Sequence, residues 1–201
     1  MAKMGLSFPY IGKYNATDDG VVSYTDGQVL AKAVEMSTSI EASADNNLYA
    51  DNGVAESDSA FGGGELSVTT DDLTQDASAL IMGIVAKTIT VGSATVKELV
   101  YDDDMNAPYL GLGVIIKKKQ GTLKWRAVVF TKIKFSIFDE SATTQGETIE
   151  WQTSEISATI MRDDSAKHAW KREATFETEA EARAYIKSIL SVGTVEEPEE
   201  P

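Results

Sequence analysis

Cysteine is absent from the 201 residues, and histidine occurs once, as His168. The chain therefore has no disulfide, no thiolate nucleophile and no cysteine ligand for zinc, and one imidazole leaves little for acid–base catalysis. No serine-nucleophile elbow, phosphate-binding loop or dinucleotide fingerprint occurs either. We expect no catalytic residue, no cofactor and no bound metal, and we expect His168 to lie at the surface.

Basic residues are also scarce, with 18 lysines and arginines against 32 acidic residues and a net charge of −14. Such a protein repels a nucleic-acid backbone unless its cations gather on one surface, which disfavours generic DNA binding. No stretch approaches the roughly 20 apolar residues of a membrane span, and the first residues lack the apolar core of a signal peptide. We expect a soluble protein that stays in the cytoplasm where it is made.

Alternating apolar and polar residues dominate what is present, which predicts a mainly β fold, a β-sandwich or barrel-like domain over residues 1–191. Residues 5–14 and 21–41 predict early strands, and the even positions of the second, from Leu30 to Ile40, form its apolar side. Further strands are expected over residues 65–70, 88–101 and 147–162, the last with a bulge near 153–154.

A long hairpin over residues 109–138 gives the strongest local signal. With Gln120-Gly121 as a two-residue loop, Ile116 pairs with Trp125 and Lys117 pairs with Lys124. This register places the apolar side chains of both strands on one face. The opposite face is then basic, and its cations are Lys117, Lys119, Lys124, Arg126, Lys132 and Lys134.

Two helices are expected. Asp72 with Gln75 resembles a capping box and precedes apolar residues at helical spacing, which predicts a flanking helix at about 73–86. Thr178 with Glu181 is a capping box that predicts a C-terminal helix at about 178–190. Residues 192–201 are acidic and interrupted by proline, so we expect a disordered acidic tail.

Residues 42–64 change in composition to Asp, Asn, Ser and Gly, which predicts a long loop. Asp51 and Asn52 begin a turn within it, residues 47–50 fit a short strand, and residues 62–64 fit a flexible hinge. A mobile surface excursion and a partner-binding loop explain this composition about equally well.

Two charged clusters are candidate contact surfaces. Asp102, Asp103 and Asp104 form a turn that suits solvent or a charged partner better than a metal ion, because the spacing does not match a calcium loop. Lys117 opposite Lys124 is repulsive, so an anion should lie nearby, and the most plentiful anion is another copy of the chain. A head-to-tail contact and a solvated, aggregation-resistant edge remain equal alternatives.

The order of these parts resembles the major tail proteins of long-tailed bacteriophages over residues 5–190. The resemblance rests on the Tyr49-Ala50-Asp51-Asn52-Gly53 loop, the Asp-Leu-Thr-Gln-Asp-Ala segment within residues 71–77, the long hairpin, and Trp151-Gln152-Thr153 in a final strand. It implies a β-sandwich with a flanking helix, similar to other injection-tube proteins, including those of contractile secretion systems. Subunits would close into hexameric rings that stack into the tail tube for genome ejection.

The same resemblance implies a location in the virion tail after assembly in the host cytoplasm. The implied partners are further copies of the chain, the tape measure protein and the tail terminator, with DNA passing through the lumen without specific binding. The candidate subunit-interface residues are Asp51, Asn52, Asp102, Asp103, Asp104, Lys117, Lys119, Lys124 and Arg126.

Two other functions remain open. A monomeric carbohydrate- or surface-binding β-sandwich would present Trp125, Trp151 and Trp170 as stacking platforms. A metal-dependent hydrolase would need convergent carboxylates, which the sequence scatters over turns.

Overall fold

A computed structural model describes residues 2–43, 46–50, 53–58, 60–144 and 152–193. The chain is mainly β, with 54% strand and 12% helix, which confirms the predicted class. The strands are β1 (Ala2–Ala16), β2 (Val22–Val29), β3 (Ala33–Ala42), β4 (Asn46–Ala50), β5 (Gly53–Asp58), β6 (Phe61–Thr70), β7 (Lys87–Val91), β8 (Ala94–Glu98), β9 (Leu110–Gln120), β10 (Thr122–Phe135), β11 (Ser154–Met161) and β12 (Lys171–Phe176), and the helices are α1 (Gln75–Met82) and α2 (Glu179–Leu190).

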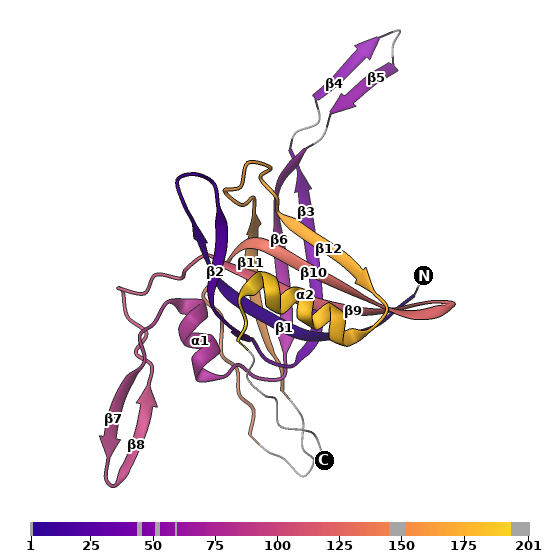
Figure 1. The fold of residues 1–201 in the computed structure, drawn as a ribbon. Coiled ribbons are helices and arrows are strands. Elements are labelled where there is room, and N and C mark those ends of the chain that lie inside the picture. The colour runs from indigo at the N-terminus through magenta and orange to yellow at the C-terminus, as the bar shows by residue number, and fades with distance from the viewer. Residues whose placement is uncertain (1, 44–45, 51–52, 59, 145–151, 194–201) are drawn as a thin grey trace.

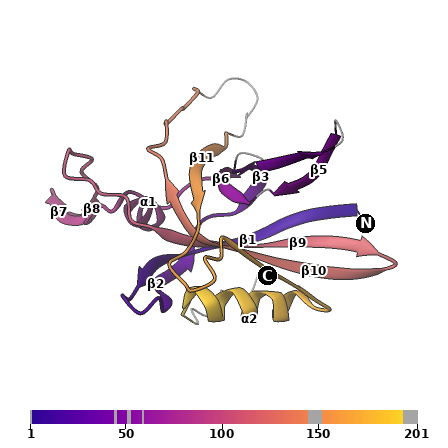
Figure 2. The ribbon, with the colours of Figure 1, turned by 90° about the horizontal axis from the view of Figure 1, so that it is seen from above.

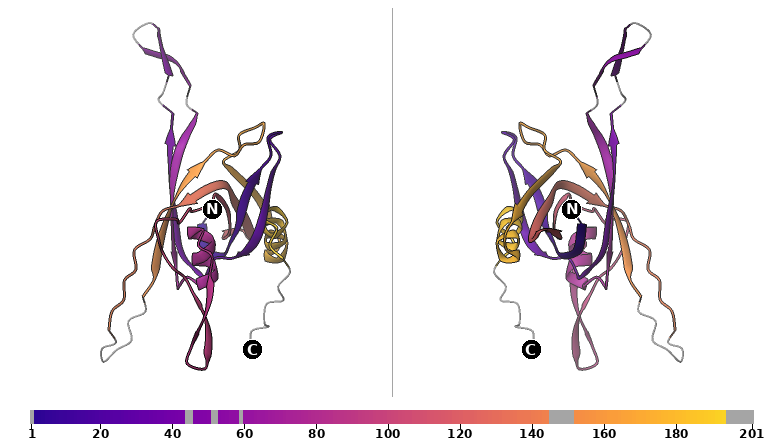
Figure 3. Two further views of the ribbon diagram at one scale, coloured as in Figure 1. Left: turned by 90° about the vertical axis from the view of Figure 1, so that its left-hand side faces the viewer. Right: turned by 90° about the vertical axis from the view of Figure 1, so that its right-hand side faces the viewer.

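One antiparallel sheet in the order β2-β1-β9-β10-β11-β6-β3 forms the body, and β12 also pairs with β10. Strand β10 divides its second edge between two partners. Its residues 125–130 pair with β12, and its residues 132–135 pair with β11. The sheet therefore folds into two layers that share β10, one containing β2, β1, β9 and β12 and the other containing β11, β6 and β3 (Figure 3).

Two apolar cores stabilise these layers. The first lies between the layers, draws on β6, β9, β10 and β11, and is joined by Ala77, Ile81 and Met82 of α1. The second lies between the outer face of the first layer and α2, whose Ala182, Ile186 and Leu190 are buried. Strands β9 and β10 are consequently buried on both faces over much of their length.

The predicted register of the β9–β10 hairpin is wrong by one residue. Gly121, at φ +72°, is the single residue between the last paired positions of the two strands, so Trp125 faces Lys117 instead of Ile116. A slip of one residue exchanges the two faces of a strand. The apolar residues of the hairpin are therefore shared between both cores instead of lying on one face.

Both predicted helices are present, and their ends follow local chemistry. Helix α1 is shorter than expected because Thr74, not Asp72, caps its N-terminus and Gly83 ends it in the left-handed conformation. Helix α2 has the predicted capping box between Thr178 and Glu181 and ends before Gly193 as expected. Of the predicted acidic tail, residues 194–201 lie outside the described part of the chain.

Two hairpin arms project from the body (Figure 1). Strands β4 and β5 pair with each other, so the predicted loop over residues 42–64 is wrong for most of its length. The predicted hinge at residues 62–64 is also wrong, because these glycines belong to β6 and Gly64 pairs with both β3 and β11. Strands β7 and β8 form the second arm, which confirms the strands expected within residues 88–101.

Three further expectations about strands need correction. The segment 21–41 contains two strands, β2 and β3, and Leu30 between them is buried. On β3 the predicted apolar side is only partly covered, because Met36 packs on the first core while Val34 and Ile40 are exposed on this edge strand. Residues 147–151 of the expected final strand lie outside the described part of the chain; within it the strand begins at Ser154, so the expected bulge there is the strand's start.

Candidate assembly surfaces

The basic residues predicted to share one face are split between two. We name the end of the β9–β10 hairpin with the adjoining start of β1 the basic tip, and its cations are Lys3, Lys117, Lys118, Lys119, Lys124 and Arg126. Lys117 lies across from Trp125, and its ammonium is 6.0 Å from the indole centroid. The register places Lys118 and Lys124 on the opposite face, where they pair directly.

Some of the negative charge expected beside these lysines comes from carboxylates of the same chain. Lys124 forms an ion pair with Glu177, and Arg126 lies 3.4 Å from the Glu173 carboxylate. A hydrogen bond from Lys171 is the main cause of the lowered pKa of Glu173, and Arg126 contributes. Burial and the nearby Arg126 guanidinium lower the pKa of Lys118. Two carboxylates against six cations leave the tip positive.

The acidic turn at residues 102–104 is exposed, as the sequence indicates. The Asp104 backbone N–H donates to the Asp102 carboxylate at 3.1 Å, and the Met105 N–H donates to the Asp102 carbonyl. The turn is thus ordered by its own side chain. Within the described residues, no group of three or more His, Cys, Asp or Glu side chains is placed to hold a metal ion. Asp51 and Asn52 lie outside the described part of the chain.

The second layer presents a face that sequence reasoning did not single out. We name the solvent side of β3, β6 and β11 the acidic sheet face. Its cross-strand rows are Glu35–Thr69–Glu155, Ser37–Ser67–Ser157 and Ser39–Glu65–Thr159, with Glu41 beyond them on β3. These are the polar alternate positions of three strands, so the pattern was present in the sequence, but it required the pairing of distant strands to be read as one surface.

Serines and threonines line much of the acidic sheet face, and a hollow of about 620 Å³ lies where Thr69 and Glu155 meet Ile137 and Phe138 of the segment after β10. A shallow depression of about 230 Å³ lies over Ser37, Ser67 and Ser157. The Ser67 hydroxyl donates to Glu155 at 2.6 Å. The nearest cation on the adjoining strand, Lys134, pairs opposite Thr159 and reaches over the Tyr109 ring. No helix covers this face, whereas α2 covers the first layer (Figures 2 and 3).

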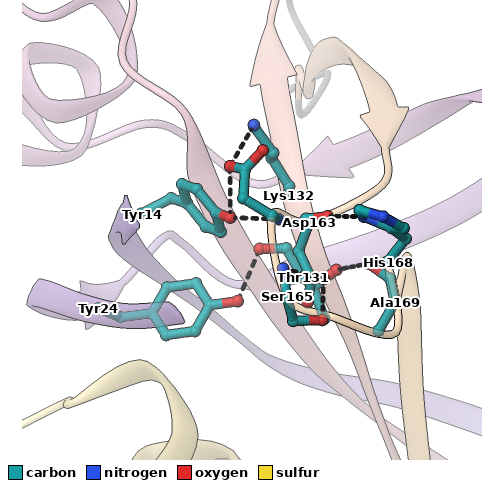
Figure 4. A network of polar contacts seen from close by, with 9 residues as sticks. Tyr14, Tyr24, Thr131, Lys132, Asp163, Ser165, His168 and Ala169 are labelled. Atoms are coloured by element: carbon teal, nitrogen blue, oxygen red, sulfur yellow. Dashed lines mark hydrogen bonds and ion pairs between the residues drawn. The ribbon is translucent and has the colours of Figure 1, made fainter. Parts of the chain in front are cut away.

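A polar network joins the β11–β12 turn to β1 and β10 (Figure 4). The Tyr14 hydroxyl donates to Asp164 at 2.8 Å, and Lys132 donates to the same carboxylate at 2.7 Å. These two hydrogen bonds lower the pKa of Asp164, with Lys132 the larger cause, while burial raises the pKa of Tyr14 to about 12. His168 is exposed, as expected, and its Nδ1 lies 3.3 Å from the Asp163 carbonyl. These hydrogen bonds hold the β11–β12 turn against β1 and β10.

The tryptophans occupy sheltered positions where they are described. Trp125 is half-buried and packs on the second core, and Trp170 stacks on Phe61 with centroids 4.6 Å apart. Trp151 lies outside the described residues. Each described tryptophan therefore has part of its ring covered by its own chain.

No family model matches this sequence, and no curated protein matches it significantly. Among the described residues, neither helix has the length and apolar character needed to cross a membrane.

Proposed function

We propose that the protein is a non-enzymatic structural subunit of a bacteriophage tail tube. Copies assemble into hexameric rings that stack into a conduit for genome ejection, and the virion tail is their location. Further copies of the chain, the tape measure protein and the tail terminator are the proposed partners. The resemblance over residues 5–190 supplies the family, and the acidic sheet face is the observation that supports the function.

The acidic sheet face suits the wall of a DNA channel. Its side chains are short hydroxyls and carboxylates, including Glu35, Glu41, Glu65 and Glu155. Carboxylates repel the phosphate backbone, and the rows themselves carry no aromatic side chain for bases to stack on, while Phe138 borders the face at the hollow beside Glu155. Duplex DNA can slide along such a surface without stopping.

Features that the chain leaves uncovered support assembly with other copies. Edge strand β3 leaves Val34 and Ile40 exposed, and an unpaired edge readily accepts a strand or side chains from a neighbour. Two arms extend away from the body, where they have few contacts within their own chain (Figure 1). Repeated heterologous contacts between identical subunits generate rings or filaments.

Light scattering across protein concentration, joined to negative-stain imaging, tests the proposal. We expect hexameric rings or hollow tubes, formed spontaneously or after addition of preformed tube fragments as templates. A strict monomer under both conditions would contradict the proposed function and direct attention to ligand screening.

A further inference from the structure

The β7–β8 arm is amphipathic. Its cross-strand pairs are Lys87–Glu98, Thr88–Lys97, Ile89–Val96, Thr90–Thr95 and Val91–Ala94. Because side chains alternate along a strand, Ile89, Val91 and Val96 share one face and the threonines share the other. We call the first of these the apolar arm face.

Among the described residues, the apolar arm face is largely open to solvent, with Ile89 half-buried. Val91 is 64% exposed and Val96 is 44% exposed, and Val85, Val100 and Tyr101 are exposed at the base of the arm. Exposed apolar side chains that form one contiguous patch rimmed by polar residues are typical of interaction sites. An isolated two-stranded hairpin is only marginally stable in water. The arm is tied to α1 by an ion pair between Lys97 and Asp76, and both partners are more than half exposed.

Acidic residues outnumber basic ones at the base of the arm. Asp102 and Asp104 line a hollow of about 190 Å³ there, together with Val85, Val100 and one cation, Lys87. The base of the arm therefore combines exposed apolar side chains with carboxylates, and a cationic partner with apolar side chains of its own would match it.

The basic tip has the opposite character. It carries exposed Leu123 and Met4, at 40% and 56%, among six cations. The arm and the tip lie at opposite ends of the molecule (Figures 1 and 2). The two surfaces of one copy are thus far apart, whereas those of two copies can meet head to tail.

We propose that the apolar arm face docks onto the basic tip of a second copy. Leu123 and Met4 then cover the arm's valines, while the tip lysines meet Asp102 and Asp104. This inference rests on the proposed self-assembly and names the two surfaces that make one of its contacts.

Disulfide trapping tests the contact directly, because the chain has no cysteine of its own. In the double variant Val96→Cys with Leu123→Cys, mild oxidation of assembled material should give a ladder of covalent multimers on a non-reducing gel. Each single variant should give dimers at most. The pair Thr90→Cys with Leu123→Cys is the matched control, because Thr90 lies on the opposite face of the arm, and it should give at least about tenfold less ladder.

A second variant tests the energetic role of the arm. Val91→Ser with Val96→Ser should raise the concentration needed for assembly about tenfold or more, because these valines lose their apolar contact with the neighbour. Circular dichroism and melting of the monomer should be unchanged, since both side chains are exposed. Thr90→Ser with Thr95→Ser is the control on the polar face and should assemble as the original chain does.

The outcomes separate the two proposals. If tubes form normally but the cysteine pair gives no covalent ladder, the docking contact is overturned and the proposed function stands. The same holds if the serine variant assembles as the original chain does. A chain that never associates, with or without template, would overturn both.

Discussion

Gly83 shows how one backbone position sets the length of a helix. Its φ of +69° ends α1, and a β-carbon at this position would overlap the carbonyl oxygen of Asn106. The left-handed conformation alone disfavours any side chain, and the overlap adds to it.

Gly83→Ala should lower the free energy of unfolding by about 1–3 kcal/mol, measured by urea denaturation. Gly121→Ala is the control, because Gly121 has a similar φ of +72° and open space around it. The free energy of unfolding of this control should fall by about 1 kcal/mol. Equal losses in the two variants would show that the contact with Asn106 costs nothing.

The lowered pKa of Asp164 predicts that the stability of the fold depends on pH. Its pKa is lowered in the folded protein by Lys132 and Tyr14, so the carboxylate stabilises the fold above its ordinary pKa of 3.8, and that contribution is lost as the pH falls through the folded-state value. Because its side chain is 51% exposed, solvent screening limits the contribution to about 1 kcal/mol at most.

Asp164→Asn should therefore be less stable than the original chain at pH 7, with the difference shrinking as the pH is lowered below about 4. Urea denaturation at several pH values measures this. Asp19→Asn, at an exposed turn position, is the control, and its stability at pH 7 should match that of the original chain. A penalty for Asp164→Asn that stayed constant down to pH 2.5 would rule out the carboxylate as its cause.

At the scale of elements, the cap of α2 is the clearest target. The Thr178 side chain accepts a hydrogen bond from the Glu181 backbone, and the Glu181 carboxylate accepts one from the Thr178 N–H. Thr178→Ala should cost about 1 kcal/mol of unfolding free energy in thermal or urea denaturation, because α2 covers the second core. Thr178→Ser keeps the hydroxyl and should restore most of the loss. Failure of serine to do so would assign the effect to packing by the methyl group.

Elements defined by local chemistry were predictable from the sequence, and their pairing was not. The capping box of α2 lies within four residues, so it identified the helix directly. The β9–β10 hairpin was predicted, but its register depends on how many residues the turn leaves unpaired around Gly121. Both faces of this hairpin contain apolar residues, so the hydrophobic pattern did not reject the wrong register.

The candidate surfaces show the same limit. The acidic turn at residues 102–104 is contiguous in the chain and was found. The acidic sheet face joins β3, β6 and β11, and the pairing partners of β6 and β11 are far apart in the sequence, as Gly64 and Ile160 are. Its serines and glutamates read as ordinary solvent positions until the strands are placed side by side.

For the whole molecule, the distribution of charge predicts how an assembled tube treats DNA. Glu35→Lys with Glu65→Lys places cations on the acidic sheet face, where neither carboxylate forms an ion pair among the described residues. Tubes of this variant should form but should retain short labelled duplex DNA at low salt, as measured by co-sedimentation, and release it as salt rises.

Tubes of the original chain should retain none. Asp18→Lys with Asp19→Lys makes the same change of charge at the exposed β1–β2 turn and is the control. Equal retention by both variants would mean that net charge, and not the sheet face, governs the interaction with DNA.

Strand β10 has a mechanical consequence through its divided edge. Since it pairs with β9 along one side and with β12 and then β11 along the other, neither layer can peel away without breaking hydrogen bonds to this strand. A force along the strand direction loads these ladders in shear, so many hydrogen bonds must break together. The body of the subunit should therefore yield as one unit under force, as a rigid segment between the more compliant arms.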